Sequence, residues 1–415
     1  MEKLQENKSK VVLIPVESYE NRTAILDALR RGLQLLGGPE AFFEKDERIL
    51  LKPNLLKTAV PEQAITTHPA VFWAMGKLLL EAGYTNLVYG DSGALPIGGS
   101  QTAAASGLAA EGEALGIPFG NFEESVTVPD PRSENGDTFV LCKAVTEADA
   151  ILSLCKMKTH ALERITGAVK NTYGCIFKHY KAMGHSKFPN ETVFAKMLVR
   201  LNLYLKPRLY LMDGIVAMEG NGPSSGDPVE MKVLLLSADP VAMDSVQAAL
   251  MYLDPELVPT NLCGAESGLG VYRWDSIDVL VPGGAKSGES GAASVNGPAF
   301  ETLTPAQAAE RYGKRDFNVY RDPEPKNSHR WLALVEKVSR RKPVVTKERC
   351  IGCGICVKSC PLTGKAILLE EKNGKKYPRY HYDQCIRCFC CQEVCPQKAI
   401  DARKPLLRKL VERVW

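Results

Sequence analysis

The sequence predicts an α/β protein with a mostly parallel sheet and helices on both faces, followed by a small α+β domain at the carboxyl end. Two observations predict this architecture. Short apolar runs alternate with longer segments of helical period from residue 11 to residue 252, and such alternation favours a parallel sheet. Cysteines then recur at a fixed spacing between residues 350 and 395. At 415 residues, 45% hydrophobic and 24% charged, the chain has room for two or three domains.

The elements expected in the larger domain follow one another in chain order. The expected strands are residues 11–16, 48–51, 86–89, 138–143, 150–154, 208–212, 232–237 and 277–281. The expected helices are residues 22–37, 69–83, 101–115, 161–176, 191–205 and 241–252. Pro69 suits the first position of a helix, where a backbone N–H is not needed, and Gly83 closes the same helix. Residues 255–345 are less regular, and we expect a loop over residues 283–297.

Four parts of the chain are expected from these patterns. They are an α/β domain over residues 1–320 with a core at 49–255, a linker over 321–343 with a short helix at 331–338, a cysteine-rich domain over 344–402, and a final helix over 403–415. The final helix is amphipathic, because leucine and valine recur on one of its faces. We expect it to pack against the cysteine-rich domain. Binding of its basic face to a membrane surface is the alternative.

One cysteine pattern occurs twice, at an offset of 35 residues. The copies, CIGCGICVKSCP and CIRCFCCQEVCP, both have the spacing C-x2-C-x2-C-x3-C-P. Three thiolates two residues apart wrap around one face of a cubane, and the chain then turns away, so that the fourth cysteine reaches the other cubane. We therefore expect two [4Fe–4S] clusters with crossed ligands. One set is Cys350, Cys353, Cys356 and Cys395, and the other is Cys385, Cys388, Cys391 and Cys360.

Two other uses of these cysteines are weaker interpretations. Zinc modules pair C-x2-C knuckles but rarely place three cysteines at this spacing before x3-C-P. A disulfide framework needs an oxidising compartment, which nothing in the sequence indicates. Cys390 has no counterpart in the first copy, where Ile355 stands, and we expect it to fill an apolar site beside a cluster. A redox or ligand-exchange role for Cys390 is the alternative.

Residues 344–402 resemble the bacterial-type ferredoxin family with two clusters. This chain departs from the simplest pattern by two extra residues after the first Cys-Pro pair, between Pro361 and Ala366. The departure changes a turn and leaves the cysteine ligands in place.

The net charge of +4 is unevenly distributed. Residues 340–415 contain 18 lysines and arginines against 7 aspartates and glutamates. Part of this positive charge offsets the negative clusters, and the rest could help the small domain to dock on the acidic larger one. Nucleic-acid binding is not expected, because aromatic residues do not interleave with the basic ones. We expect no signal peptide and no transmembrane segment, hence a cytoplasmic protein and a reducing setting that suits thiolate-bound iron.

Polar residues collect where the expected strands of the larger domain end. In open parallel sheets, ligands bind at these carboxyl ends. Lysine, histidine and asparagine in such a crevice suit a small anionic substrate. The candidate substrate-binding residues are Lys52, Asn54, His68, Asp91, Lys158, Asn171 and Asp213. No phosphate-binding loop and no G-x-G-x-x-G after a strand support a nucleotide site.

A set of short motifs in this domain resembles the family called domain of unknown function 362, over about residues 49–255. They are Lys52-Pro53-Asn54, Thr67-His68-Pro69, Gly90-Asp91, Lys158-Thr159-His160, Lys170-Asn171-x2-Gly174, Asp213-Gly214, Glu219-Gly220-x-Gly222-Pro223 and Asp244. Members of this family are often fused to a two-cluster ferredoxin. The resemblance implies an α/β domain and no established reaction.

The leading functional hypothesis is an iron–sulfur protein that passes single electrons between a redox partner protein and a site in the larger domain. As a reductase, it would use His160, Lys170 and His185 as candidate acid and anion-binding groups. A non-catalytic redox carrier or binding module is the second hypothesis. Metal handling by four histidines is the third; these are His68, His160, His179 and His185.

Overall fold

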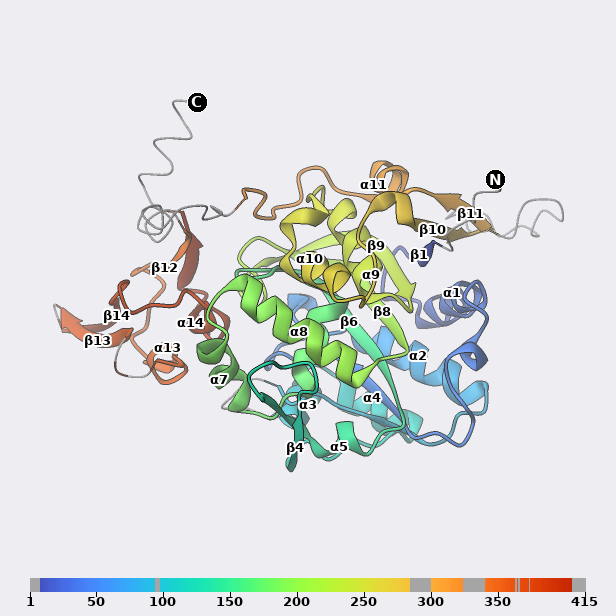
Figure 1. Ribbon diagram of the computed structural model, residues 1–415, viewed down its shortest axis with the longest axis horizontal. Helices are drawn as coiled ribbons and strands as arrows, with labels where there is room; N and C mark the ends of the chain where they lie inside the picture. Colours follow the sequence, from blue (N-terminus) through green and yellow to red (C-terminus); the bar gives the residue numbers. More distant parts are fainter. Residues whose placement is uncertain are drawn as a thin grey trace.

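The computed structural model describes residues 8–93, 98–283, 300–323, 340–362, 364, 366–372 and 374–404. Its larger part is one mixed sheet with helices on both faces, and a smaller part lies beside the sheet at the left of Figure 1. We call this smaller part, residues 340–404, the cluster module. The expected helix at 331–338 and the main part of the expected helix at 403–415 lie outside the described residues, as does most of the predicted linker.

The sheet contains nine strands among the described residues. Their order is β11 (Phe300–Leu303), β10 (Ile277–Pro282), β1 (Ser9–Pro15), β9 (Asp227–Ser237), β8 (Leu209–Glu219), β6 (Ala150–His160), β2 (Ile49–Pro53) and β3 (Leu87–Tyr89), with β7 (Arg164–Thr166) beside β6. Strands β8, β6, β2 and β3 are parallel neighbours, and so are β1 and β10. Strands β7, β9 and β11 run the other way. Six of the nine strands thus share one direction, and the predicted fold class is confirmed.

Helices cover both faces of the sheet. One face packs against α1 (Arg22–Gln34), α2 (Pro69–Glu81) and α4 (Leu108–Leu115). The other face packs against α6 (Ala168–Asn171), α8 (Glu191–Leu205), α9 (Pro240–Leu250), α10 (Pro259–Glu266) and α11 (Pro305–Tyr312). In Figure 1, α8, α9 and α10 lie in front of the sheet. The shorter helices are α3 (Gly99–Ala105), α5 (Lys143–Thr146) and α7 (Tyr180–Lys187).

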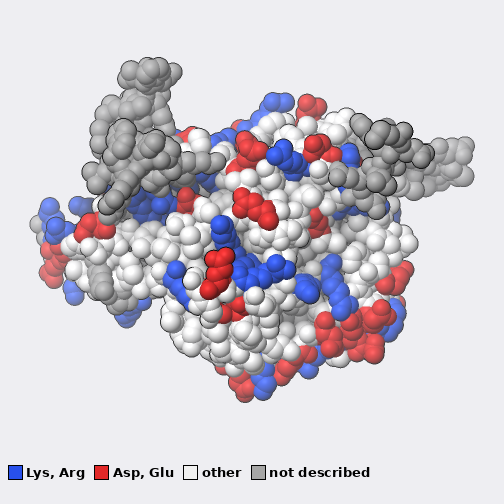
Figure 2. Space-filling view, viewed as in Figure 1, with Lys and Arg blue, Asp and Glu red and all other residues white. Residues whose placement is uncertain are grey.

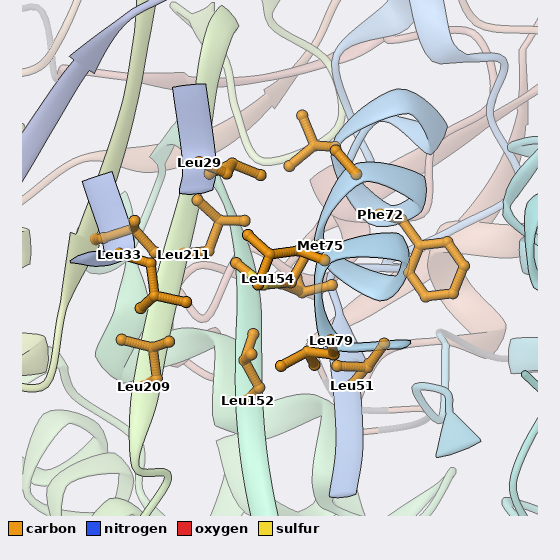
Figure 3. Packing of buried hydrophobic residues seen from close by; sticks show 14 of the residues in the cluster. Leu29, Leu33, Leu51, Phe72, Met75, Leu79, Leu152, Leu154, Leu209 and Leu211 are labelled. Carbon is orange, nitrogen blue, oxygen red and sulfur yellow. The ribbon is translucent and has the colours of Figure 1, made fainter. Parts of the chain in front are cut away.

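Burial on both faces explains why the central strands are apolar along their whole length. In β8, Leu209 and Leu211 face α1 and α2, whereas Tyr210 and Met212 face α9. Side chains alternate between faces along a strand, so each residue of such a strand meets a helix layer. Figure 3 shows the first layer, in which leucines of β6 and β8 meet Leu29 of α1 and Met75 of α2.

Two of the predicted helices differ from the structure. The predicted helix 101–115 is split into α3 and α4 at Gly107, whose φ of 80° is left-handed. The predicted helix 161–176 is wrong, because β6 continues to His160 and turns back as β7 before α6 begins. Asp244 explains the late start of α6, since its carboxylate accepts the backbone N–H groups of Ala168 and Val169 at the helix start.

The part expected to be irregular contains ordered elements that sequence periodicity missed. Helices α10 and α11 and strand β11 lie within residues 255–345, and helix α7 lies in a segment where no element was expected. These elements are short, and their pattern is too brief for a periodicity argument. They gain their stability from packing on the sheet.

The cluster module has a small α+β fold. Two antiparallel pairs form it, β12 (Lys342–Val345) with β15 (Ile400–Arg403) and β13 (Ile367–Lys372) with β14 (Lys375–Tyr380). One short helix contains the third cysteine of each closely spaced run, Cys356 in α13 (Ile355–Lys358) and Cys391 in α14 (Cys390–Glu393). The two halves of the cysteine repeat therefore adopt the same local structure.

Replacing Val12 of β1 by alanine should lower the free energy of unfolding by about 2 kcal/mol, because two buried methyl groups are lost and a cavity remains. Val12 is 0% exposed. Val126 in β4 (Ser125–Pro129) is the matched control, since it is a strand valine that is 38% exposed. Its replacement should change stability by less than about 0.5 kcal/mol. Urea titration followed by circular dichroism measures both, and equal losses would contradict a central, buried β1.

Candidate functional site

Two hollows in the cluster module are each lined by four cysteines. Cys350, Cys353, Cys356 and Cys395 line the first. Cys360, Cys385, Cys388 and Cys391 line the second. Each set takes three cysteines from one copy of the repeat and the fourth from the other copy, which is the grouping that a crossed assignment requires.

Four thiols around one hollow are the ligand set that a [4Fe–4S] cluster takes. Burial raises the pKa of Cys356 and of Cys385 to about 11. A thiol with a raised pKa keeps its proton at neutral pH unless a metal displaces it. The loop around the first hollow also needs its glycine. Gly352 has a φ of 69°, and a Cβ added there would lie 2.6 Å from the carbonyl oxygen of Lys376.

The ninth cysteine of the module, Cys390, lines neither hollow. It is buried, and its side chain hydrogen-bonds with that of Cys388. After burial, a negative charge on Cys390 is the next cause that raises the pKa of Tyr173 in the larger domain. Cys390 thus lies between a cluster-lining cysteine and the larger domain. The expectation that it fills an apolar site stays a prediction.

Helix α14 of the module docks on the loop that follows β8. The buried side chain of Gln392 donates a hydrogen bond to the carbonyl oxygen of Asn221 at 2.6 Å, and Ser224 donates to the carbonyl oxygen of Glu393 at 2.6 Å. Lys398 donates to the carbonyl oxygen of Gly226 at 3.0 Å. Two ion pairs add to this contact, Arg340 with Glu191 and Lys404 with Asp322. Basic groups of the module therefore do meet acidic groups of the larger domain.

The centre of this contact is a hydrogen bond between Glu393 of the module and His160 of the larger domain. Their Oε1 and Nε2 atoms are 3.1 Å apart. His160 Nδ1 accepts the backbone N–H groups of Leu162 and Glu163, so the ring proton is on Nε2 and is donated to Glu393. Burial lowers the pKa of His160 to about 3, helped by the nearby charge of Lys170. The imidazole is therefore neutral at neutral pH.

The carboxylate of Glu393 is ionised despite its burial. Burial alone would raise its pKa, but the hydrogen bond from His160 and the charge of Lys170 outweigh that effect and lower the pKa to about 2. His185 also acts on Glu393, and burial lowers the pKa of His185 to about 4. Its ring stacks on Phe194 at 4.3 Å between ring centres. The three predicted catalytic residues thus lie around one carboxylate.

Lys170 is the available cation of this group. It is half-buried, and none of the described residues forms an ion pair or hydrogen bond with its ammonium group, which lies 5.7 Å from the ring centre of Tyr173. Glu163 is the other unusual group. It is buried without a hydrogen-bond partner among the described residues, and burial raises its pKa well above the usual value. Glu163 is therefore a neutral acid beside the His160 loop.

Sequence reasoning missed Glu393 and Tyr173 as members of this site. One signal could have found Glu393. The two cysteine repeats differ at this position, where the first copy has Lys358, and at the preceding one, where Gln392 replaces Val357. Buried polar residues at these positions mark the copy that faces the larger domain.

The predicted substrate-binding residues do meet at the carboxyl ends of the strands, but they are buried and bonded to one another. Lys52 Nζ lies 2.6 Å from Asp91 Oδ2 and 3.2 Å from Asn171 Oδ1. Asn171 also accepts from Asn54 at 3.1 Å, and Asn54 in turn accepts from Lys158 at 2.8 Å. All five residues are less than 9% exposed. Among the described residues, this cluster, the lysine network, is a buried part of the core.

Asp213 and His68 belong to a second closed group. Asp213 accepts hydrogen bonds from Tyr19 at 2.6 Å, from Lys156 at 2.7 Å and from the backbone N–H of His68 at 2.9 Å. The His68 ring stacks on Tyr19 at 3.5 Å, and its Nδ1 accepts the N–H of Ala70 at the start of α2. Burial lowers the pKa of His68 to about 4. The ring is therefore neutral at neutral pH.

The four histidines do not form one metal site. His68 lies in the Asp213 group, His160 and His185 lie near Glu393, and His179 lies beside Tyr180. Among the described residues, no three His, Cys, Asp or Glu side chains converge as ligands of a single metal ion. No helix in the described part of the chain has the length and apolar character needed to cross a membrane.

Comparison with known proteins identifies the two parts. Residues 49–249 match the model of domain of unknown function 362, and residues 349–399 match that of a 4Fe-4S dicluster domain. The thylakoid-associated protein sll1697 of Synechocystis sp. (strain ATCC 27184 / PCC 6803 / Kazusa) is 37% identical over 262 residues, which are 62% of this chain and 79% of that protein. The chain belongs to the DUF362 family.

Two solved structures have weaker likeness to this DUF362 protein. The lactate racemase apoprotein of Thermoanaerobacterium thermosaccharolyticum matches with a TM-score of 0.34 and 14% identity over 57% of this chain and 56% of its own. A protein of Thermotoga maritima matches with a TM-score of 0.30 and 12% identity over 50% of this chain and 54% of its own. Both likenesses are too weak to bear on activity.

Replacing Lys52 of the lysine network by methionine should destabilise the protein by about 3 kcal/mol, because Asp91 would keep a buried charge without its partner. Asp91→Leu should cost a similar amount. The double variant should be more stable than either single variant, since no uncompensated charge remains. Urea unfolding of the four proteins measures the cycle. Additive losses in the double variant would contradict a coupled buried pair.

Proposed function

We propose that this protein transfers single electrons through two [4Fe–4S] clusters to a site on its DUF362 domain, where a small anionic molecule is reduced. The observation that carries the proposal is the hydrogen bond between Glu393 and His160. This hydrogen bond connects helix α14, which contains the cluster-lining Cys391, to the group containing Lys170 and His185. When bound, each cluster would supply one electron at a low potential.

The eight cysteines that line the two hollows are the proposed ligands, in the crossed sets given above. The match to a dicluster domain and the two separate hollows support a count of two clusters. All 13 cysteines lack disulfide partners. We propose that the protein works in a reducing compartment, the cytoplasm, where thiolate-bound iron is stable.

Residues of the DUF362 domain have separate tasks in this proposal. Lys170, whose ammonium group has no ion pair or hydrogen bond among the described residues, would bind the anionic group of the substrate. His160 would hold a proton on Nε2, and His185 would hold the substrate from the other side. A cavity of about 370 Å³ is lined by Tyr173, by residues of α7 and by apolar side chains that include Ile176 and Phe188. It offers room for the body of a small molecule.

The lysine network has a supporting task. Its charges are paired in the core, so Lys52, Asn54, Asp91, Lys158 and Asn171 would hold the strand ends in place instead of contacting substrate. A cavity of about 740 Å³, lined by residues that include Tyr252 and Trp274, lies beyond the end of α9, and none of the residues around Glu393 lines it. We assign it no part in the reaction.

Protein purified without oxygen should contain about eight irons and eight sulfides per chain. Pairs of serine variants test the crossed assignment. Cys360→Ser with Cys388→Ser should leave about four irons, because both residues serve one cluster. Cys360→Ser with Cys350→Ser should remove almost all iron. Cys390→Ser is the matched control and should keep about eight. The reverse result for the two double variants would establish an uncrossed assignment.

Replacing His160 by glutamine or Lys170 by glutamine should slow substrate-dependent reoxidation of the reduced protein by about 100-fold or more. A screen of small anions under anaerobic conditions first identifies the molecule that reoxidises the clusters. Reduction by dithionite should be unaffected, since neither residue is a cluster ligand. The exposed His179→Gln and Lys196→Gln are matched controls on the same domain. Unchanged reoxidation in the first pair would remove these roles and favour a non-catalytic carrier.

A further inference from the structure

The two copies of the cysteine repeat face different surroundings. The second copy is turned toward the DUF362 domain. Its Phe389 is 4% exposed and packs in the core formed with α8, and Gln392 is fully buried against Asn221. The hollow lined by Cys388 therefore adjoins the site around Glu393.

The first copy is turned toward solvent. Ile351 is 65% exposed, and Cys353 is an exposed cysteine in the first hollow. Leu369 of β13 is 39% exposed and lies beside Gly354, where an added Cβ would be 3.0 Å from Leu369. One member of this set, Cys395, does face the larger domain near Lys57. The opposite side of the first hollow is open to a partner.

Basic side chains surround this open side. Lys347, Lys358 and Lys376 are exposed, and none of the described residues forms an ion pair with them. Lys376 lies next to Gly352. Gly352 itself stands between Ile351 and Cys353 in the sequence. On the adjoining strand, Glu370 is paired with Arg379, and the exposed Glu371 lies opposite Lys376 in the strand register. In Figure 2 the outer edge of the module, at the left, carries several basic side chains with acidic ones between them.

We propose that this docking face, made of Lys347, Ile351, Cys353, Lys358, Leu369 and Lys376, receives an acidic one-electron carrier protein. The inference deepens the proposed function and rests on it. Exposed apolar side chains beside a cluster ligand give a short path for the electron, and unpaired lysines attract a negative partner. An anionic membrane would also attract the lysines, but it exchanges no electrons, so it would not explain an exposed cluster-lining cysteine at the centre of the face.

The transfer involves one electron and no proton. The carrier would be oxidised by one electron. Cys350, Cys353, Cys356 and Cys395 would hold the cluster that supplies the one-electron acceptor, and Cys360, Cys385, Cys388 and Cys391 would hold a second acceptor next to the Glu393 site. A second carrier repeats the step, so a two-electron reduction of the substrate needs two docking events.

The test measures reduction of the full-length protein, with its clusters, by a reduced acidic [2Fe–2S] ferredoxin in stopped flow at low salt. Lys347→Glu with Lys376→Glu should slow this reaction at least about 10-fold, and the difference should shrink at high salt. Binding between the two oxidised proteins should weaken in parallel. Lys10→Glu with Lys196→Glu is the matched control, because these lysines are exposed on the larger domain and the charge change is the same.

Reduction by the methyl viologen radical cation should not slow in either double variant, which shows that the clusters are intact. Equal ferredoxin rates in all proteins, or binding of the docking face to anionic lipid vesicles but not to ferredoxin, would overturn the docking proposal alone. A protein that neither reductant bleaches would overturn the proposed function itself. The two failures are therefore distinguishable.

Discussion

The hydrogen bond between His160 and Glu393 is the constraint on which the proposed electron path depends. A carboxylate removed from water is costly unless donors surround it. Here the donor is a neutral imidazole from the other domain, with the charge of Lys170 nearby. Neither domain satisfies these groups alone, so the pair favours one orientation of the module. That orientation brings the hollow lined by Cys388 next to the DUF362 domain.

The lysine network shows how the same polar residues can serve as scaffold. Strand ends are where α/β proteins commonly bind ligands, and here the charges at those ends are already matched, Lys52 with Asp91 and Lys156 with Asp213. Buried pairs of this kind hold neighbouring strands in register because separating them would leave unpaired charges in the core. In the proposed function, the groups left for substrate are those toward the module, above all Lys170.

Sequence differences between the two cysteine repeats explain why one hollow adjoins the larger domain and the other lies toward solvent. Cysteine spacing is the same in both copies, so the local fold is the same. The residues between the cysteines differ, with Phe389 and Glu393 in the second copy where Gly354 and Lys358 stand in the first. Apolar and acidic side chains suit burial against the larger domain, and lysine suits solvent. One copy of the duplicated motif therefore packs against the larger domain, and the other faces solvent.

The sequence by itself determined the fold class and the grouping of the cysteines around the two hollows, because periodicity and ligand spacing are local properties of the chain. It did not determine which polar groups are open. Lys52 and Lys170 have the same side-chain chemistry. Only the packing of the sheet decides that Lys52 is paired with Asp91, while Lys170 has no ion-pair partner among the described residues. It also missed Glu393, which becomes a site residue through a contact across 233 positions. Such contacts depend on how separately folded segments pack. The difference between the two cysteine repeats at this position marks Glu393 as unusual, but it does not identify His160 as its partner.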